Sequence, residues 1–361
     1  MLDEDLVASW DQLALATGAP VFARPGWLRV WAQAFGKTAA LRALTVHRGG
    51  DLVGVLPVIN GPLGVRTPVN SETALVAPVV ADDDAAGSLA EFLLARRPGP
   101  VDLDAVLADD PVTVALRGTA DRAGVPVLEV HRCSSPYVDT VGDPAAFTQR
   151  LSRNRRHGLK RLQNRLREAG EVSFEVVDGS DGDLAGRLRE GLALEAREWK
   201  LAAGSAIVSS PARVAFYTAG ARWAAEAGVL RLAFLRLDGT AIAFGYCLQQ
   251  GRTLHFLKLG MDDARAKLGP GILITKYLID HAFAEPEVAE LDMLGENESY
   301  KADFASGARE QVRLRAYPAP GVGGVHRAAT ARVADLRAAA VARLSGPTRE
   351  RLLALRNRLA R

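Results

Sequence analysis

The feature that most constrains the fold is a set of three β-prone runs joined by two tight turns. The runs read VLRLAFLRL, AIAFGYCLQ and RTLHFLKLG, and Asp238-Gly239 and Gln250-Gly251 separate them. Asp-Gly between β-rich runs is a strong hairpin signal, because both central positions of the turn need a positive φ. The sequence therefore predicts an antiparallel three-stranded meander over residues 229–260.

Regular elements are also expected on both sides of this meander. Val172–Val177 alternates like a strand, and Ser210-Pro211 is typical of a helix start. From residue 172 onward the order β-α-α-β-β-β-α-β-α-β predicts a mixed, mostly antiparallel sheet flanked by helices. Besides the meander, the expected elements are a strand at 172–177, helices at 183–201, 211–228 and from 269, a strand at 288–294, a helix at 297–305 and a strand at 311–317.

The first half of the chain repeats part of this order less clearly. A helix is expected at 27–35 and strands at 41–48 and 52–59, and helix, strand, helix and strand follow from 83 to 130. We interpret this half as a degenerate second copy of the same unit, so that the chain has an α/β (α+β) fold of two tandem copies. The expected parts of the chain are domains at 1–135 and 136–320 and a basic helical tail at 321–361.

A strongly basic segment joins the two copies. Asp143-Pro144 is typical of a helix start, and we expect one linking helix over 143–169. Between Arg150 and Arg167 it carries eight Arg or Lys and no acid. Three interpretations stay open: a solvated helix face, a site for the phosphates of a coenzyme or of a nucleotide-linked acceptor, or a site for the acceptor stem of a tRNA. The lack of aromatic residues among the charges argues against nucleic acid.

Composition places the 361-residue chain among globular proteins of two domains, with 48% apolar and 24% charged residues. Cys133 and Cys247 are far apart in sequence, which argues against a disulfide scaffold or a structural zinc site. The N-terminus is acidic and no run of about 18 apolar residues occurs, so we expect no signal peptide, no membrane span and a cytoplasmic protein. Walker, HExxH, GxSxG and dinucleotide motifs are absent from the sequence.

Five segments together resemble a known group of enzymes. In chain order they read PVFARPGWLRVWAQAFG, LSRNRRHGLKRLQNRLREAG, EAREWK, LGPGILITKYLIDHA and LDMLGENESYKADFASG. With the element order above, they resemble the GNAT superfamily of N-acyltransferases. They resemble more closely its CelD/BcsL-like acetyltransferases, which have tandem GNAT domains and are related to the Fem peptidoglycan ligases. The resemblance covers residues 9–318, and it implies acyl transfer without naming the acceptor.

The resemblance implies a donor site at the turn Gly269-Pro270-Gly271. Unpaired amides at a helix start, together with small residues, suit a diphosphate, and GNAT enzymes hold coenzyme A in this way. Here the basic residue of the GNAT pattern is shifted to Arg265, and Pro270 removes one amide donor. A plain helix-initiating turn, or a site for another anion, would explain the same residues. The predicted coenzyme-binding residues are His255, Leu257, Lys267, Leu268, Gly269, Pro270, Gly271 and Ile272.

The last strand of the meander is expected to act mainly through its backbone. In GNAT enzymes this strand diverges from its neighbour and pairs with the pantetheine amides of the donor. By alternation we place His255, Leu257 and Leu259 on one face and Lys258 on the other. His255 could serve as a base, because imidazole titrates near neutrality, although a packed polar residue is the simpler interpretation.

One cluster of candidate chemical groups lies near the end of a predicted helix. Glu195 and Glu198 are three residues apart, so both can face one cleft, and by family pattern Glu198 is the preferred base for the acceptor amine. A solvated helix with Glu-Lys pairs explains the charges equally well. The predicted acceptor-binding residues are Trp199 and Lys200 of this cluster, with Arg153 and Arg156 of the linking helix.

A second cluster follows the strand beside the donor helix and contains Asp292, Tyr300 and Lys301 as catalytic candidates. In Fem-like relatives a lysine at the place of Lys301 supports the reacting carbonyl, and in many GNAT enzymes a tyrosine near Tyr300 protonates the leaving thiolate. A fixed donor is stronger in a dry site, which suits either role. Alternatively, Tyr300 belongs to the core and Lys301 to the surface.

The main hypothesis is transfer of an acyl group, acetyl for preference, from acyl-CoA to an amine of a small molecule or saccharide bound between the copies. No metal is required, and nucleic acid is expected only in the first alternative. That alternative is a Fem-like transferase that uses aminoacyl-tRNA to form a peptide bond. The second alternative is a non-catalytic component of polysaccharide or natural-product biosynthesis. The acceptor, the acyl length and the oligomeric state are not predicted.

Overall fold

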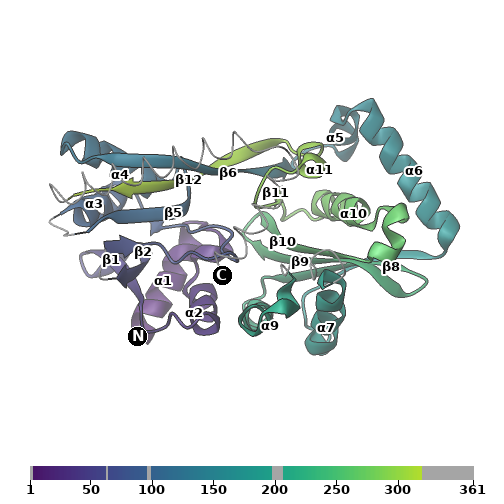
Figure 1. Ribbon diagram of the computed structural model, residues 1–361, viewed down its shortest axis with the longest axis horizontal. Coiled ribbons are helices and arrows are strands. Elements are labelled where there is room, and N and C mark those ends of the chain that lie inside the picture. Colours follow the sequence, from purple (N-terminus) through teal and green to yellow (C-terminus); the bar gives the residue numbers. More distant parts are fainter. Residues whose placement is uncertain (1–2, 62–63, 96–98, 197–205, 319–361) are drawn as a thin grey trace, which may run out of the picture.

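The computed structural model describes residues 3–61, 64–95, 99–196 and 206–318 (Figure 1). Within these ranges the strands form one 12-stranded sheet that runs through both halves of the chain, with helices packed on its faces. The strand order is β1-β2-β3-β5-β12-β6-β11-β10-β9-β8-β7, and β4 pairs with β2. The predicted mixed, mostly antiparallel sheet is confirmed, and the predicted tail at 321–361 lies outside the described residues.

The elements of the first half follow the expected order, with a helix ahead of those predicted. In chain order they are α1 (Glu4–Ala16), η1 (Val21–Ala23), α2 (Pro25–Ala34), β1 (Leu41–Arg48), β2 (Asp51–Gly61), β3 (Gly64–Arg66), β4 (Val79–Val80), α3 (Asp83–Leu94), β5 (Val101–Leu107), α4 (Pro111–Arg122) and β6 (Val127–Asp139).

The elements of the second half begin after a short connecting helix. In chain order they are α5 (Pro144–Arg150), α6 (Arg153–Ala169), β7 (Val172–Val177), α7 (Leu184–Glu195), η2 (Ile207–Ser209), α9 (Pro211–Glu226), β8 (Leu230–Leu237), β9 (Thr240–Gln250), β10 (Thr253–Met261), η3 (Asp263–Leu268), α10 (Pro270–Ala284), β11 (Glu290–Asp292), α11 (Ser299–Ala302) and β12 (Gly307–Ala316).

The two halves repeat one scheme and exchange their last strands. Each has two helices, three successive antiparallel strands, a helix and a further strand, and that strand is parallel to the third, as β5 is to β3 and β11 to β10. The long strands β6 and β12 pair with each other, yet β12 also pairs with β5 and β6 with β11. The domain boundary that we expect near residue 135 lies inside β6, and it stays a prediction.

The meander has the predicted turns. Asp238 and Gly239 have φ of 49° and 74°, as a two-residue hairpin turn of this kind requires, and Gly251 has φ of 54°. Strands β8, β9 and β10 pair antiparallel through both turns. The prediction of a meander is confirmed.

The linking segment differs from its prediction as one helix over 143–169. It forms two helices, because α5 ends at Arg150 and α6 starts at Arg153. Leu151 is buried in an extended conformation, and the Ser152 side chain accepts a hydrogen bond from the Arg155 N–H at 3.1 Å, which caps α6. The single-helix prediction is wrong because this N-cap outweighs the helical pattern of the basic residues.

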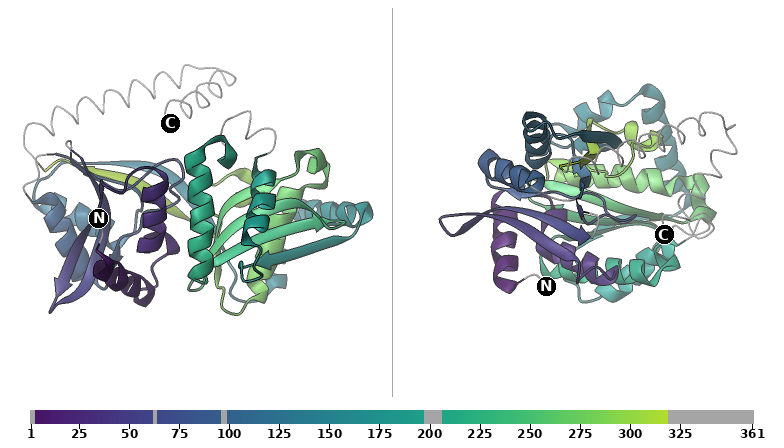
Figure 2. Two further views of the ribbon diagram at one scale, coloured as in Figure 1. Left: turned by 90° about the horizontal axis from the view of Figure 1, so that it is seen from below. Right: turned by 60° about the vertical axis from the view of Figure 1, so that its left-hand side comes forward.

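Helices cover the sheet of the second half on both faces (Figures 1 and 2). One face packs on α10 and α6 through a core that includes Leu159, Leu166 and Leu278. The other packs on α7 and α9 within a core that continues into the first half, where Trp27 of α2 lies 4.9 Å from Phe216 of α9 between ring centroids. The halves thus share a sheet and a core. In the described part of the chain, no helix is both long and apolar enough to cross a membrane.

Candidate active site at the open edge of β10

Strand β10 leaves its neighbour β11 after three residue pairs. The parallel pairing covers Thr253, Leu254 and His255, whereas β10 continues to Met261. Beyond His255 no strand among the described residues pairs with that edge of β10. The backbone from residue 256 onward is therefore available on one side to a ligand in extended conformation.

A β-bulge at Leu257 changes which side chains share a face of β10. Phe256 pairs with Cys247 and Lys258 with Tyr246, so Leu257 is the extra residue. Leu257 packs on the core beside α9, and Lys258 lies on the same side, 5.5 Å from the Tyr217 ring centroid. Leu259 packs on the opposite core beside α10. The prediction that Leu259 shares a face with His255 and that Lys258 lies opposite is wrong, because the bulge interrupts the alternation.

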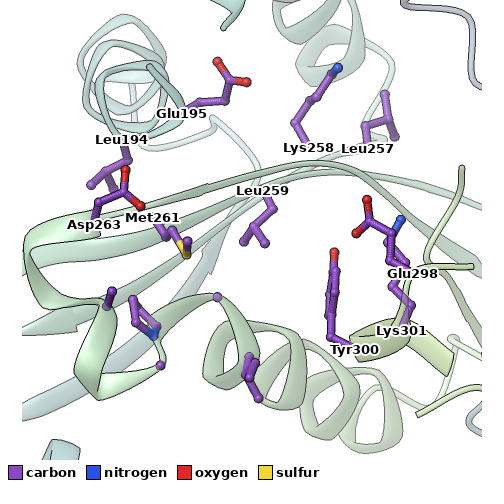
Figure 3. A pocket seen from close by; sticks show the side chains of 15 residues that line it. Leu194, Glu195, Leu257, Lys258, Leu259, Met261, Asp263, Glu298, Tyr300 and Lys301 are labelled. Carbon is purple, nitrogen blue, oxygen red and sulfur yellow. The ribbon is translucent and has the colours of Figure 1, made fainter. Parts of the chain in front are cut away.

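A cavity of about 520 Å³, here called the α10 cavity, lies between the open edge of β10 and the start of α10 (Figure 3). Most of its wall is aliphatic. Its lining residues are Leu194, Glu195, Leu257, Lys258, Leu259, Met261, Asp263, Ala266, Gly269, Pro270, Gly271, Ile272, Glu298, Tyr300 and Lys301.

The start of α10 presents backbone amides to this cavity. Gly269 has φ of 65° and Pro270 occupies the first helical position. The Leu273 N–H donates the first helical hydrogen bond, to the Gly269 carbonyl at 3.0 Å. The amides of Gly271 and Ile272 precede that bond, so neither has an acceptor within the helix. A Cβ on Gly271 would lie 3.1 Å from the Met261 Sδ, so glycine keeps the backbone close to β10.

A second cavity of about 500 Å³, here called the inter-half cavity, has a more polar wall. The first half supplies the loop at 71–74 and part of β6, and the second half supplies α9, β10 and the segment after β11. The residues that line both cavities are Leu257, Lys258, Leu259, Tyr300 and Lys301. The two spaces therefore meet at the bulge of β10.

A buried ion network stands in the wall of the inter-half cavity. The side chain of Glu72 is 4% exposed, and its Oε1 lies 2.8 Å from the Arg213 Nε. Its Oε2 lies 3.0 Å from the Lys258 Nζ and accepts a hydrogen bond from the Tyr217 hydroxyl at 2.9 Å. Burial opposes ionisation of Glu72, but these partners outweigh it and hold the pKa of the carboxyl below its ordinary value. The network fixes Lys258 at the junction of the cavities.

Tyr300 and Lys301 reach the junction from α11. Burial, reinforced by the Glu298 carboxylate, raises the pKa of Tyr300 well above its ordinary value, so the phenol stays protonated. The Lys301 Nζ donates to the carbonyl of Leu294 at 2.8 Å, and burial lowers the pKa of this ammonium against the opposing pull of nearby carboxylates. Both side chains line the α10 cavity and the inter-half cavity, and their predicted catalytic roles stay predictions.

Arg155 of α6 holds the short helix that carries Tyr300. Its Nη2 donates to the Tyr300 carbonyl at 2.9 Å, and its guanidinium lies 4.4 Å from the Phe304 ring centroid. From the sequence we predicted Arg153 and Arg156, and not Arg155, as acceptor-binding residues of this helix. Arg153 is exposed, and Arg156 donates to the carbonyls of Gln149 and Leu151, where it caps α5. Neither of these two lines the α10 cavity or the inter-half cavity.

His255 and Asp292 lie in the paired part of the sheet, outside both linings. The Asp292 Oδ1 accepts the Leu294 N–H at 2.9 Å, which shapes the turn after β11. The His255 ring is 4% exposed and lies 5.0 Å from Phe22 between centroids, with its Nδ1 3.6 Å from the Asp292 Oδ2. These two side chains therefore lie within the paired part of the sheet and not in the wall of either cavity.

The remaining predicted residues lie either at the turn before α10 or in a segment outside the described residues. Lys267 is exposed and Leu268 packs on the core below α10, while Gly269 to Ile272 line the α10 cavity. Glu198, Trp199 and Lys200 lie outside the described residues. Glu195 is described and buried, and its Oε2 accepts the Ile207 N–H at 2.8 Å.

Sequence reasoning missed Glu72, Arg155 and the place of Lys258. Glu72 lies in a polar loop of the first half, which we interpreted as a degenerate copy. Its partners follow 141 to 186 residues later, so no local sequence pattern indicates a role for Glu72 in this network. Arg155 had a usable signal, because Ser152 three residues earlier is a good N-cap that sets the phase of α6. Among the described residues, no group of three or more His, Cys, Asp or Glu is arranged to hold a metal ion.

Comparisons with known proteins agree with this geometry. Residues 153–302 match the family model described as Acetyltransferase (GNAT) domain. A comparison with curated proteins returns no match.

Three solved structures share the fold over most of both chains. The C-terminal domain of a putative lysylphosphatidylglycerol synthetase from Agrobacterium fabrum is 12% identical with a TM-score of 0.54, over 90% of this chain and 95% of that chain. A conserved protein of unknown function from Bacteroides thetaiotaomicron is 11% identical with a TM-score of 0.55, over 87% and 96%. FemX is 10% identical with a TM-score of 0.54, over 86% and 95%.

These likenesses concern the fold alone, whereas the family match concerns the segment that builds the α10 cavity and the open edge of β10. Residues 153–302 are thus similar to the Acetyltransferase (GNAT) domain model, and they lie within a longer chain that has the fold of these three proteins.

Proposed function

We propose that the protein transfers an acyl group, acetyl for preference, from acyl-CoA to the amine of a small molecule or saccharide. The observation that carries this proposal is the meeting of two cavities at the bulge of β10, with Lys258, Tyr300 and Lys301 in both walls. Two substrates that enter from opposite sides would place their reacting atoms at that junction. The CelD/BcsL-like group is the family subdivision that we propose for it.

The α10 cavity suits the donor. The amides of Gly271 and Ile272 would take the diphosphate, because a helix start offers unpaired N–H groups and a partial positive charge. The pantetheine arm is an uncharged chain with two amides, and it would lie along the aliphatic wall and pair with the open edge of β10 beyond His255. In this arrangement the thioester would point toward Tyr300.

The inter-half cavity suits the acceptor, because its wall is polar and comes from both halves of the chain. In the reaction, the amine nitrogen forms a bond to the thioester carbon and loses a proton, and the carbon–sulfur bond breaks. The phenol of Tyr300, which is protonated across the neutral range, would give its proton to the sulfur as the carbon–sulfur bond breaks. Lys301 would stabilise the carbonyl oxygen as negative charge develops. Glu198 or water accepts the proton of the amine.

The test is calorimetric titration with acetyl-CoA, followed by a thiol-release assay with a panel of amines that includes amino sugars and amino acids. The proposal expects acetyl-CoA binding at one site per chain and amine-dependent release of free thiol. A parallel titration with charged tRNA at several salt concentrations examines the Fem-like alternative, since tRNA binding would weaken steeply with salt. Binding of tRNA without binding of acetyl-CoA would overturn the proposal.

A further inference from the structure

Lys258 lines both cavities, yet the proposed reaction assigns it no step. Its ammonium carries three N–H donors. In the part of the chain that the structure describes, the carboxylate within ion-pair distance of the Lys258 Nζ is that of Glu72, with Oε2 at 3.0 Å. Further donors therefore remain for a ligand, on a side chain that is 27% exposed.

The ammonium of Lys258 lies on the acceptor side of β10. Figure 3 shows the side chain on the side of β10 away from α10. Its Nζ is 5.5 Å from the ring centroid of Tyr217, which lines the inter-half cavity and not the α10 cavity. The donor would approach from the α10 side, so a group held by the Lys258 ammonium would belong to the acceptor.

Glu72 compensates only part of the charge of Lys258, because its carboxylate also serves two other groups. Its Oε1 lies 2.8 Å from the Arg213 Nε, and its Oε2 accepts the hydrogen bond of the Tyr217 hydroxyl at 2.9 Å. The same network holds the Lys258 Nζ in one position. Lys258 therefore offers its remaining donors in a fixed direction, and binding costs little further side-chain entropy.

The other charged side chains of the inter-half cavity suit different tasks. Arg132 is paired with Asp104 at 2.6 Å, and Lys301 donates to the Leu294 carbonyl at 2.8 Å, where it would support the reacting carbonyl. Glu296 is an exposed carboxylate of the same wall and suits the protonated form of an incoming amine. The wall thus presents both signs of charge, as a zwitterionic ligand requires.

We infer that the acceptor is an amino acid or another small amine that carries a carboxylate, and that Lys258 binds this carboxylate. The inference rests on the proposed function and narrows its acceptor to this class. A carboxylate next to the amine can accept from Lys258 while the amine faces the thioester. Hydrogen bonds between two charged groups are roughly twice as strong as neutral ones. The cavity volume of about 500 Å³ suits a small molecule.

The experiment measures kcat/KM for matched pairs of amines, each an L-amino acid and its carboxamide, through the release of free thiol from acetyl-CoA. The carboxamide keeps the shape of the acid and removes its charge. The wild type should prefer the acids about 10-fold, the effect of one charge-assisted contact at a partly exposed site. The supply of free amine favours the carboxamide, whose amine is less basic, so it cannot produce this preference.

A pair of variants examines Lys258 itself. Lys258→Met keeps much of the length of the side chain, removes its charge and should reduce the preference to about twofold. The control Lys160→Met removes an exposed lysine of α6 that lines neither the α10 cavity nor the inter-half cavity, and it should keep the wild-type preference. The preference is a ratio of two substrates on one enzyme, so a smaller folded fraction of Lys258→Met leaves it unaffected.

Three outcomes would overturn the inference and leave the proposed function standing. The first is an equal kcat/KM for acids and carboxamides in the wild type, a comparison that needs no variant. The second is an unchanged preference in Lys258→Met. The third is binding of acetyl-CoA without thiol release by any amino acid, for example with amino sugars or their phosphates as the only substrates. Failure of the wild type to bind acetyl-CoA would instead reject the proposed function itself.

Discussion

Glu72→Gln is the perturbation that best examines how the first half supports the site. The substitution keeps the shape of the side chain but removes the charge that faces Arg213 and Lys258 at 2.8 and 3.0 Å. An amide also brings its own N–H donors toward two cations and the Tyr217 hydroxyl, so at least one partner is left unsatisfied.

The size of the expected loss in unfolding free energy follows from how deeply Glu72 and its partners are buried. Removing one partner of a buried ion pair costs about 3–5 kcal/mol, because the remaining charge stays buried without compensation. The side chain of Lys258 is 27% exposed and can turn toward water, whereas that of Arg213 is 12% exposed. We therefore expect a loss of about 3 kcal/mol in the free energy of unfolding at pH 7, at the lower end of that range.

Urea unfolding at several pH values measures this effect. A carboxyl with a depressed folded pKa stabilises the protein above its unfolded pKa of about 4.3 and loses that contribution as pH falls through the folded pKa. The difference between wild type and variant should therefore be full at pH 6–7 and shrink below about pH 4. Glu4→Gln, which removes a carboxylate 74% exposed and paired with Arg29, should cost no more than about 1 kcal/mol. If Glu72→Gln costs as little as this control, the network does not hold Lys258 in place.

Three further substitutions examine the junction. Gly271→Trp should fill the mouth of the α10 cavity beside Met261 and weaken acetyl-CoA binding on the order of 100-fold in calorimetry, and a near-wild-type affinity would place the donor elsewhere. Tyr300→Phe should lower kcat about 100-fold and leave the dissociation constant of acetyl-CoA unchanged. The control Tyr277→Phe, on the far side of α10, should keep the wild-type kcat. Equal kcat values for the two variants would show that Tyr300 takes no part in the proton transfer. Arg155→Lys should lower kcat and loosen α11, seen as faster hydrogen exchange there, because one ammonium cannot both donate to Tyr300 and stack on an aromatic ring.

Much of the fold could be predicted because it rests on local signals. The turns at Asp238-Gly239 and Gln250-Gly251 fixed the meander, and Gly269-Pro270 marked the start of α10. The exchange of β6 and β12 could not be predicted, because their pairing joins residues 170 to 189 positions apart and both strands could also close within their own halves. Alternation along β10 failed at Leu257, since a bulge is one extra residue without a distinctive sequence.

The part of the candidate site that backbone atoms form could be predicted from the sequence. Gly269, Pro270 and Gly271 lie at the cavity because a glycine-containing helix start has one geometry whatever surrounds it. Side chains depend on tertiary contacts, and this is why Asp292 shapes a turn and Arg156 caps a helix while Glu72 enters the wall from the other half. Tyr300 and Lys301 line both cavities, and their catalytic roles stay predictions.

A crystal structure with acetyl-CoA is the most direct measurement of the central claim. The diphosphate should accept hydrogen bonds from the amides of Gly271 and Ile272, with the pantetheine chain along β10 beyond His255 and the thioester carbon between Tyr300 and the inter-half cavity. A diphosphate bound elsewhere, or a thioester that points away from Lys258 and the cavity behind it, would contradict the account.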